Sequence, residues 1–302
     1  MPTYSGQFAD LLERQEKEIY FRNLANVVQL REQLFQSRPS TKAYEDRQRV
    51  AGLGRMATKP EGTPVSFDDP VIGVRRRTVH QTYALGWRCT MEMQQDDLFN
   101  VMDRMTEELV DSTVDHQERL AWGLIDDGFA GATYTGLDGL SLFNASHPNL
   151  KLGGTQSNIL NPAVALGTTG IEAIMTMART TTNEEDRFIP LDYSILVIHP
   201  NLEHQADTLL DTQYQVDSSN NNINTVSKSR SRLTPLVVPY LTSTTAWSVH
   251  APKGKNDLVW NDRMSPSFDQ SGDADTKDLK HYACYRASVQ TSEWRGNWGS
   301  NA

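Results

Sequence analysis

The chain has 302 residues and a formal net charge of −9, which suggests one large or two ordinary domains and disfavours sequence-specific nucleic-acid binding. No run of about 18 apolar residues occurs, so we expect no membrane-spanning helix, and the polar N-terminus predicts no secretory signal. Cys89 and Cys284 lack metal-ligand or redox-motif spacing and are expected to be reduced thiols in a cytosolic product. The hydrophobic share of 38% is low for this length, which favours burial of surface against other copies of the chain.

The first segment, residues 5–36, places a thin apolar face among many Glu, Arg and Gln residues and predicts a helix. Its apolar side chains include Phe8, Leu12 and Ile19, which are candidates for a subunit interface. Two interpretations stay open for this segment. An ordinary surface helix is the one that the residues favour, and an arm that packs on another subunit is the alternative.

Residues 51–70 are rich in glycine, proline and charge, so they predict a loop or the tip of a hairpin. The following residues, from Val71 to Cys89, contain the Val, Thr, Tyr and Trp side chains that favour strands. We therefore predict a long two-stranded hairpin over residues 60–92. Because both of its faces are largely polar, such a hairpin must lie on something, most simply a neighbouring chain.

One basic cluster, Arg75-Arg76-Arg77, alternates across the predicted strand. It could grip acidic side chains or nucleic acid, and contact with acids on a neighbouring chain is the better interpretation. We expect Phe67 and Trp87 to belong to the same subunit interface.

The longest predicted element is a helix over residues 94–128. One face recurs at steps of three or four, and most of its residues are apolar: Leu98, Met102, Met105, Leu109, Ser112, His116, Leu120 and Leu124. Asp96 and Asp97 suit the positive end of the helix dipole, and Gly128 supplies a stop. A helix of this length would be about 50 Å long. Polar Ser112 and His116 make it a poor isolated coiled coil, so it should lie along a sheet or neighbouring chains.

The rest of the chain predicts a mixture of short elements. Irregular structure is expected over residues 129–168, a short helix over 169–179, a buried strand over 191–199 and then a helix that begins at Pro200. A polar mobile loop is predicted over residues 217–231. Further strands are expected over 233–240, 246–251, 256–260 and 281–292, and the last residues from Trp294 are expected to form a tail. Helices and strands without a βαβ rhythm predict an α+β fold.

Motifs for chemistry are weak in this sequence, and we predict no catalytic, cofactor-binding or metal site. Gly52 to Ala57 matches a dinucleotide pattern but lacks the strand and helix that such a motif needs. His199 and His204 do not have metal-ligand spacing. Ser146 and His147 are adjacent in a glycine-rich loop, which is not the arrangement of a catalytic triad.

The order of these parts resembles that of a tailed-phage major capsid protein with the Hong Kong 97-type fold, and looks especially like the Mu-type head subunits. The resemblance rests on the block DGLSLFNASHP at residues 138–148, the strand and helix start at residues 196–206 and the Asp-Asp-Leu opening of the long helix. The late strand before Trp294-Arg295-Gly296 also fits. Together these blocks span nearly the whole chain.

The resemblance implies a division of the chain into parts. Residues 1–50 would be the N-terminal arm and residues 51–92 an extended loop that overlies a neighbouring subunit. Residues 93–137 and 251–302 would form the peripheral domain around the spine helix 94–128, and residues 138–250 the axial domain.

The resemblance also implies a function. Copies of the chain would assemble into hexamers and pentamers and close an icosahedral head around double-stranded DNA. Its partners would be other copies of itself, a scaffolding protein, a portal and, without sequence specificity, the packaged DNA. It would be a component of the virion that assembles in the host cytoplasm.

Two other functions are compatible with the residues alone. One is a hydrolase that uses Ser146 and His147. The other is a different virion structural protein, such as a head decoration or tail component.

Overall fold

A computed structural model describes residues 6–90, 92–93, 96, 100–189, 191–212, 223–227, 233–273 and 278–302, and the side chains from residue 16 onward within these ranges. In this part of the chain, helices and strands mix in an α+β fold, as predicted. No helix among the described residues combines the length and the apolar character that crossing a bilayer requires.

Short helices and strands alternate irregularly along the chain around one long helix. The helices are α1 (Gly6–Asn26), α2 (Arg31–Leu34), α4 (Val101–Asp126), α5 (Thr168–Thr180), the 3₁₀ turn η1 (Pro200–Leu202) and α6 (Glu203–Asp211). The strands are β1 (Gln36–Pro39), β2 (Tyr44–Ala51), β3 (Val71–Val79), β4 (Gln81–Cys89), β5 (His147–Pro148), β6 (Thr155–Gln156), β7 (Ile195–Ile198), β8 (Thr234–Val237), β9 (Trp247–His250), β10 (Leu258–Gly272), β11 (Leu279–Thr291) and β12 (Asn297–Ser300).

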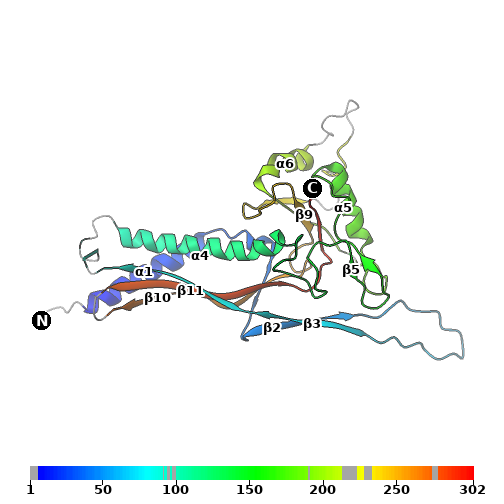
Figure 1. Ribbon diagram of the computed structural model, residues 1–302, viewed down its shortest axis with the longest axis horizontal. Coiled ribbons are helices and arrows are strands. Elements are labelled where there is room, and N and C mark those ends of the chain that lie inside the picture. The colour runs from blue at the N-terminus through cyan, green and yellow to red at the C-terminus, as the bar shows by residue number, and fades with distance from the viewer. Residues whose placement is uncertain are drawn as a thin grey trace.

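A four-stranded sheet in the order β1-β10-β11-β4 forms the elongated part of the molecule. Helix α4 lies along it, and α1 packs on α4 within the same chain (Figure 1). Alternate residues of β11, including Tyr285, Ala287 and Val289, are buried in one core with Trp122 of α4, as the two-residue period of a strand requires. The predicted strands at 256–260 and 281–292 are confirmed, and β10 runs further than predicted.

The predicted long helix is confirmed, although its start is later than residue 94. Asn100 has a left-handed backbone with φ of 51°, which separates α4 from the residues before it. The predicted opening at Asp97-Leu98 lies outside the described residues. The buried face differs from the predicted stripe, because Met105 and His116 of that stripe are exposed. Polar Thr106, Thr113 and Gln117 are buried instead, where α4 has neighbours on more than one side.

The N-terminal segment forms two helices, α1 and α2, rather than one over residues 5–36. Tyr20 of α1 is fully buried with Leu109 and Val110 of α4 and Phe268 of β10. The arm therefore packs on its own chain in this structure.

The predicted hairpin over residues 60–92 is wrong in its pairing. Strand β3 pairs with the preceding β2, so that Ala51 faces Val71 and Tyr44 faces Val79, whereas β4 joins the large sheet through β11. The true hairpin runs from residue 44 to 79 and projects away from the rest of the molecule (Figure 1). The charged sequence of β2 has no apolar alternation that could reveal it as a strand.

A second sheet in the order β12-β9-β7-β8 carries α5 and α6 and contains the C-terminus (Figure 1). The predicted strand and helix start around Pro200 are confirmed, with Pro200 at the first position of η1, although β7 is shorter than 191–199. The predicted helix at 169–179 is confirmed as α5, and the predicted strands at 233–240 and 246–251 are confirmed as β8 and β9. The predicted polar loop at 217–231 lies mostly outside the described residues.

The predicted C-terminal tail is wrong, because residues 297–300 form β12 and pair with β9. All four residues are buried, and Trp298 belongs to the second core with Trp247 and Leu196. Pairing with β9 satisfies backbone groups that would otherwise be buried without partners.

Candidate functional site

The hairpin β2–β3 holds a charge cluster of its own on one face. Asp46 of β2 accepts a hydrogen bond from Arg77 Nε at 2.9 Å and also pairs with Arg75. The Arg77 and Arg75 guanidiniums together lower the pKa of Asp46 to about 2. Arg77 also lies over the Tyr44 ring, 3.6 Å from its centre. Within the single chain these two arginines thus already meet an acid, Asp46, and their contact with acids on a neighbouring chain stays a prediction.

Arg76 points to the opposite side of β3, toward the body of the molecule. It donates to Gly136 O at 2.8 Å and to the carbonyl of Thr135. Partial burial lowers the pKa of its guanidinium, and nearby Asp138 opposes this effect. Arg76 therefore fastens the hairpin to the loop that follows α4.

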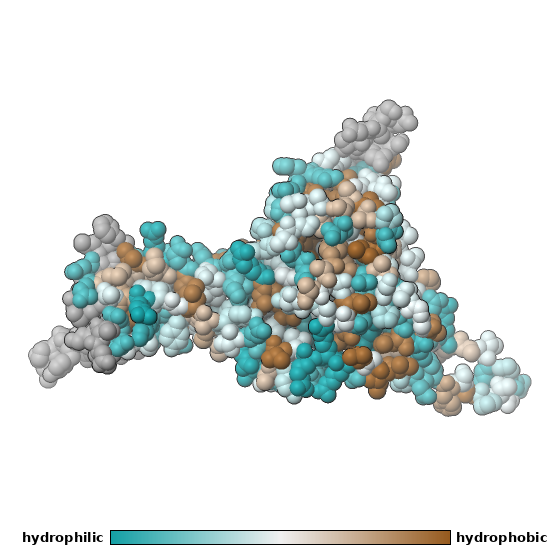
Figure 2. Space-filling model, viewed as in Figure 1, coloured by the Kyte–Doolittle hydropathy of each residue, from teal (hydrophilic) through white to brown (hydrophobic). Residues whose placement is uncertain are grey.

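The tip of the hairpin, residues 52–70, exposes several large apolar side chains. Phe67, one of the predicted interface residues, is 92% exposed, and Leu53, Met56 and Val65 in the same tip are exposed as well. Hydrophobic residues also gather on the visible face of the body close to where the hairpin leaves it (Figure 2). These exposed side chains lie on a segment that projects from the molecule and make few contacts with their own chain.

Buried charges fix the end of β2 that leads into the tip. Arg49, next to a bulge in β2, pairs with Glu184, and Glu184 also pairs with Arg295 Nη1 at 3.1 Å. Arg295 further donates to Gln156 Oε1 at 2.6 Å and to Thr182 O at 2.8 Å. This network joins the hairpin, the segment after α5 and the C-terminal segment.

Sequence reasoning assigned no role to this network. The sequence does contain a signal, the three consecutive acids Glu184, Glu185 and Asp186. These acids could have indicated partners for the basic residues of the hairpin. Arg49 lay among ordinary charged residues and gave no comparable signal.

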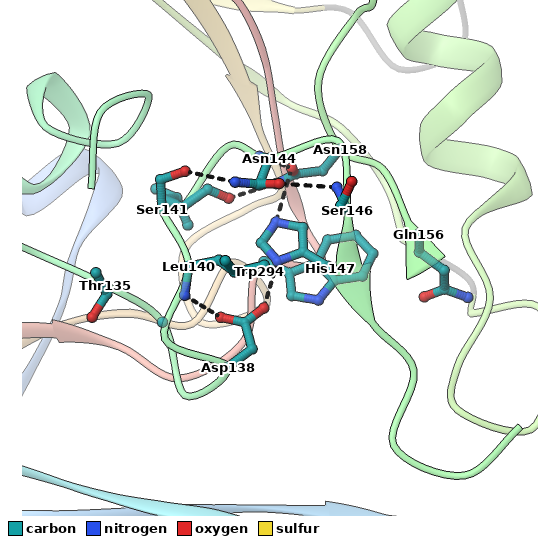
Figure 3. A network of polar contacts seen from close by, with 12 residues as sticks. Thr135, Asp138, Leu140, Ser141, Asn144, Ser146, His147, Gln156, Asn158 and Trp294 are labelled. Atoms are coloured by element: carbon teal, nitrogen blue, oxygen red, sulfur yellow. Dashed lines mark hydrogen bonds and ion pairs between the residues drawn. The ribbon is translucent and has the colours of Figure 1, made fainter. Parts of the chain in front are cut away.

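His147 lies at the centre of a second network (Figure 3). Its Nδ1 is 2.5 Å from Asp138 Oδ2, and its Nε2 is 3.2 Å from Asn158 Oδ1. The His147 ring stacks on Trp294 with 4.5 Å between ring centres. The His147 contact lowers the pKa of Asp138, although burial of that carboxyl acts in the opposite direction and is the larger single effect.

This geometry does not support the hydrolase. Both ring nitrogens of His147 are engaged by Asp138 and Asn158, so neither is left to take a proton from Ser146 (Figure 3). The cavity beside His147 has a volume of about 10 Å³, which holds a single water at most. The arrangement instead ties the loop of residues 138–158 to the C-terminal segment.

Other predicted interface residues have different surroundings. Ile19 is buried within the chain, and Trp87 stacks on His281 with 4.4 Å between ring centres. Phe8 and Leu12 lie in α1, in the part whose side chains are not described. Among the predicted interface residues with described side chains, Phe67 thus has the least contact with its own chain.

Metal chemistry has no visible basis in the described part of the chain. No group of three or more His, Cys, Asp or Glu side chains there is arranged to hold a metal ion. Cys89 and Cys284 are thiols that form no disulfide, in agreement with the prediction.

The sequence matches a known family over most of its length. Residues 75–297 match the family described as phage capsid protein. No curated protein sequence matches the chain. The fold is similar to that in the procapsid of bacteriophage JBD30, with 15% identity, a TM-score of 0.54 and coverage of 98% of this chain and 75% of that one.

Two further solved structures show the same likeness of fold. The capsid of cyanophage P-SCSP1u has 10% identity and a TM-score of 0.58, with coverage of 89% of this chain and 86% of that one. The virus-like particle from Pyrococcus furiosus has 8% identity and a TM-score of 0.56, with coverage of 95% and 98%. The family match spans well over half of the sequence, and these structures share its Hong Kong 97-type fold. The chain therefore belongs to the phage capsid protein family and is a capsid-forming structural protein.

Proposed function

We propose that copies of this chain assemble into hexamers and pentamers, and that these close an icosahedral head around double-stranded DNA. The observation that carries the proposal is the projecting hairpin, whose tip exposes Phe67, Met56 and Val65. Large apolar side chains in such a position favour contact with a second copy. The family match supports the identity of that partner, because capsid subunits assemble with one another.

We propose the following roles for the parts of the chain. Residues 1–43 serve as the N-terminal arm, and the hairpin of residues 44–79 serves as the extended loop on a neighbouring subunit. Residues 93–137 and 251–302 build the peripheral domain, and residues 138–250 the axial domain at the centres of capsomers. Phe67 lies at the subunit interface, with Arg75 and Arg77 available at its edge.

Further partners belong to the same proposal. A scaffolding protein and a portal act during assembly in the host cytoplasm, and the packaged DNA touches the inner wall without sequence specificity. The net charge of −9 supports weak contact only, since an acidic wall repels the phosphate backbone.

Electron microscopy of the purified chain tests this proposal. We expect shells, tubes or capsomers from the natural sequence. A variant in which residues 53–69 are replaced by an Asn-Gly turn keeps both strands of the hairpin and should stay folded without closing shells. The Ser146→Ala substitution serves as the control and should assemble normally. A chain that stays monomeric under every condition, or a shortened hairpin that still closes shells, would contradict the proposal.

A further inference from the structure

The segment between α5 and β7 presents three consecutive acids in a fixed conformation. Asn183 Oδ1 accepts hydrogen bonds from the backbone N–H groups of Glu185 at 3.0 Å and Arg187 at 2.8 Å. A bridge between Thr182 and Phe188 closes the loop. These contacts lie within residues 182–188, so they order Glu184, Glu185 and Asp186 independently of the hairpin.

The innermost acid, Glu184, contacts Arg49 near the end of β2. Its carboxylate pairs with Arg49 and with Arg295, and its Oε2 accepts from Leu150 N at 2.8 Å. The side chains of Glu184 and Arg49 are only 6% and 8% exposed. This contact is shielded from salt and fully hydrogen-bonded on the acid, so it is the firmest of the three.

The middle acid, Glu185, meets the hairpin through a bridging lysine. Lys151 pairs with Glu185 and also with Asp68 at 2.5 Å, on the chain that enters β3. Asp68 Oδ2 in turn accepts from Gly54 N at 2.8 Å. Lys151 and the Gly54 amide lower the pKa of Asp68.

Gly54 fits closely between these two acids. A Cβ at this position would lie 2.9 Å from Glu185 Oε2 and 3.3 Å from Asp68 Oδ2. The backbone at this glycine therefore lies close to both carboxylates, whose flexible ends could shift to make room for a side chain.

The outermost acid, Asp186, meets Arg55 beside the tip. The two charged groups lie 4.0 Å apart, and Arg55 also donates to the Asp186 carbonyl. Their side chains are 62% and 73% exposed, whereas Lys151 and Glu185 are 16% and 10% exposed. The exposure of the paired side chains thus rises from Arg49–Glu184 through Lys151–Glu185 to Arg55–Asp186. Screening of these charges by salt must rise in the same order.

We propose that the triplet Glu184-Glu185-Asp186 is an electrostatic latch that holds the hairpin of residues 44–79 against the axial part of the chain. Its three contacts break in order, beginning with the one nearest the tip. Salt first weakens Arg55–Asp186 and then the Lys151 bridge, while Arg49–Glu184 persists as the pivot. A single chain can therefore aim its hairpin in more than one direction without unfolding it. The latch is a property of one chain and does not depend on shell formation.

Distances between two spin labels, measured by double electron–electron resonance, test the latch. Labels at Thr58→Cys on the tip and Thr176→Cys on α5, in a Cys89→Ala and Cys284→Ser background, report the direction of the hairpin. At low salt we expect one narrow distance distribution, and at about 1 M salt a distribution about twice as wide, because the screening length then falls to about 3 Å. The Glu185→Gln variant should show the wide distribution already at low salt.

The matched control is Glu203→Gln, which removes the same charge from an exposed acid in the first turn of α6. It should leave the distribution narrow at low salt. Equal widths at both salt concentrations, or an equal effect of Glu203→Gln and Glu185→Gln, would contradict the latch.

Limited trypsin digestion of the unlabelled chain gives a second measurement that needs no cysteine substitution. Cleavage after Arg55, relative to cleavage after Lys42 in the loop before β2, should accelerate in Glu185→Gln and remain unchanged in Glu203→Gln. An unchanged ratio in both variants would overturn the proposal even if shells assemble normally.

Discussion

At the scale of single residues, the protonation state of a buried histidine is fixed by the groups around it. Asn297 Nδ2 donates to Asn256 O at 2.8 Å, so its Oδ1 is the atom that faces His250 Nδ1 at 2.8 Å. His250 Nδ1 therefore carries a proton, and Nε2 accepts from Ser248 Oγ at 2.8 Å. Burial lowers the pKa of His250 to about 4. A neutral His250 thus links β9 to β12.

We predict that His250 makes the protein less stable as the pH falls from about 6.5 to 4. In this window the unfolded chain binds a proton on His250 and the folded chain does not, so the free energy of unfolding falls as the pH falls. The full shift corresponds to roughly 3 kcal/mol. Urea unfolding at pH 7 and pH 4.5 should show a smaller loss in His250→Gln than in the natural chain. The variant His204→Gln, at an exposed position of α6, should behave like the natural chain, and a His250→Gln variant with unchanged pH dependence would contradict the prediction.

At the scale of elements, α1 meets the large sheet at a buried contact between a carboxyl group and a histidine ring. His281 Nδ1 of β11 lies 2.7 Å from Glu16 Oε2 of α1, and both side chains are nearly inaccessible. The His281 ring lies against Trp87 and Phe268. Buried polar groups are costly unless they meet one another, so this contact helps to fix where the arm docks.

We predict that Glu16→Ala destabilises the chain by about 1–3 kcal/mol, because it leaves the buried His281 ring without the carboxyl group beside it. Hydrogen exchange should increase in α1 and in the adjoining part of β11. Glu18→Gln, on the exposed side of the same helix, should change the free energy of unfolding by less than about 0.5 kcal/mol. Equal effects of the two substitutions would show that the buried pair does not hold the arm.

At the scale of the whole molecule, separate cores stabilise the chain while the hairpin tip belongs to none of them. One core joins α4 to the large sheet, a second fills the sheet with α5 and α6, and a third lies under α1. The tip projects beyond all three (Figure 1). Its apolar side chains therefore contribute little to the stability of the single chain.

We predict that Phe67→Ser separates assembly from stability. The unfolding free energy should change by less than about 0.5 kcal/mol, since surface substitutions usually have effects of that size. Shell formation, followed by light scattering and electron microscopy, should be strongly reduced. Val28→Ser, a comparable apolar-to-polar change at an exposed residue between α1 and α2, should leave both properties unchanged. Normal assembly of Phe67→Ser would argue against a role for the tip at the interface.

Several features followed from the sequence because they depend on local patterns. The helical period identified α4 and α5, the apolar run identified β7, and Pro200 marked the start of the following helix. The order of these parts indicated the capsid family. Phe67 is exposed in a loop of glycine and proline, and its place at an interface stays a prediction.

Other features required the tertiary structure, because strand pairing and buried charge pairs join residues that are distant in sequence. The charged strand β2 becomes a strand only by pairing with β3, and the apparent tail becomes β12 only because β9 offers an open edge. The partners of Arg49 and Lys151 could not be found locally, since Glu184 and Glu185 lie far along the chain. Local sequence thus determined which segments are helices or strands, whereas long-range pairing decided where the hairpin begins, how it is held and which acids hold it.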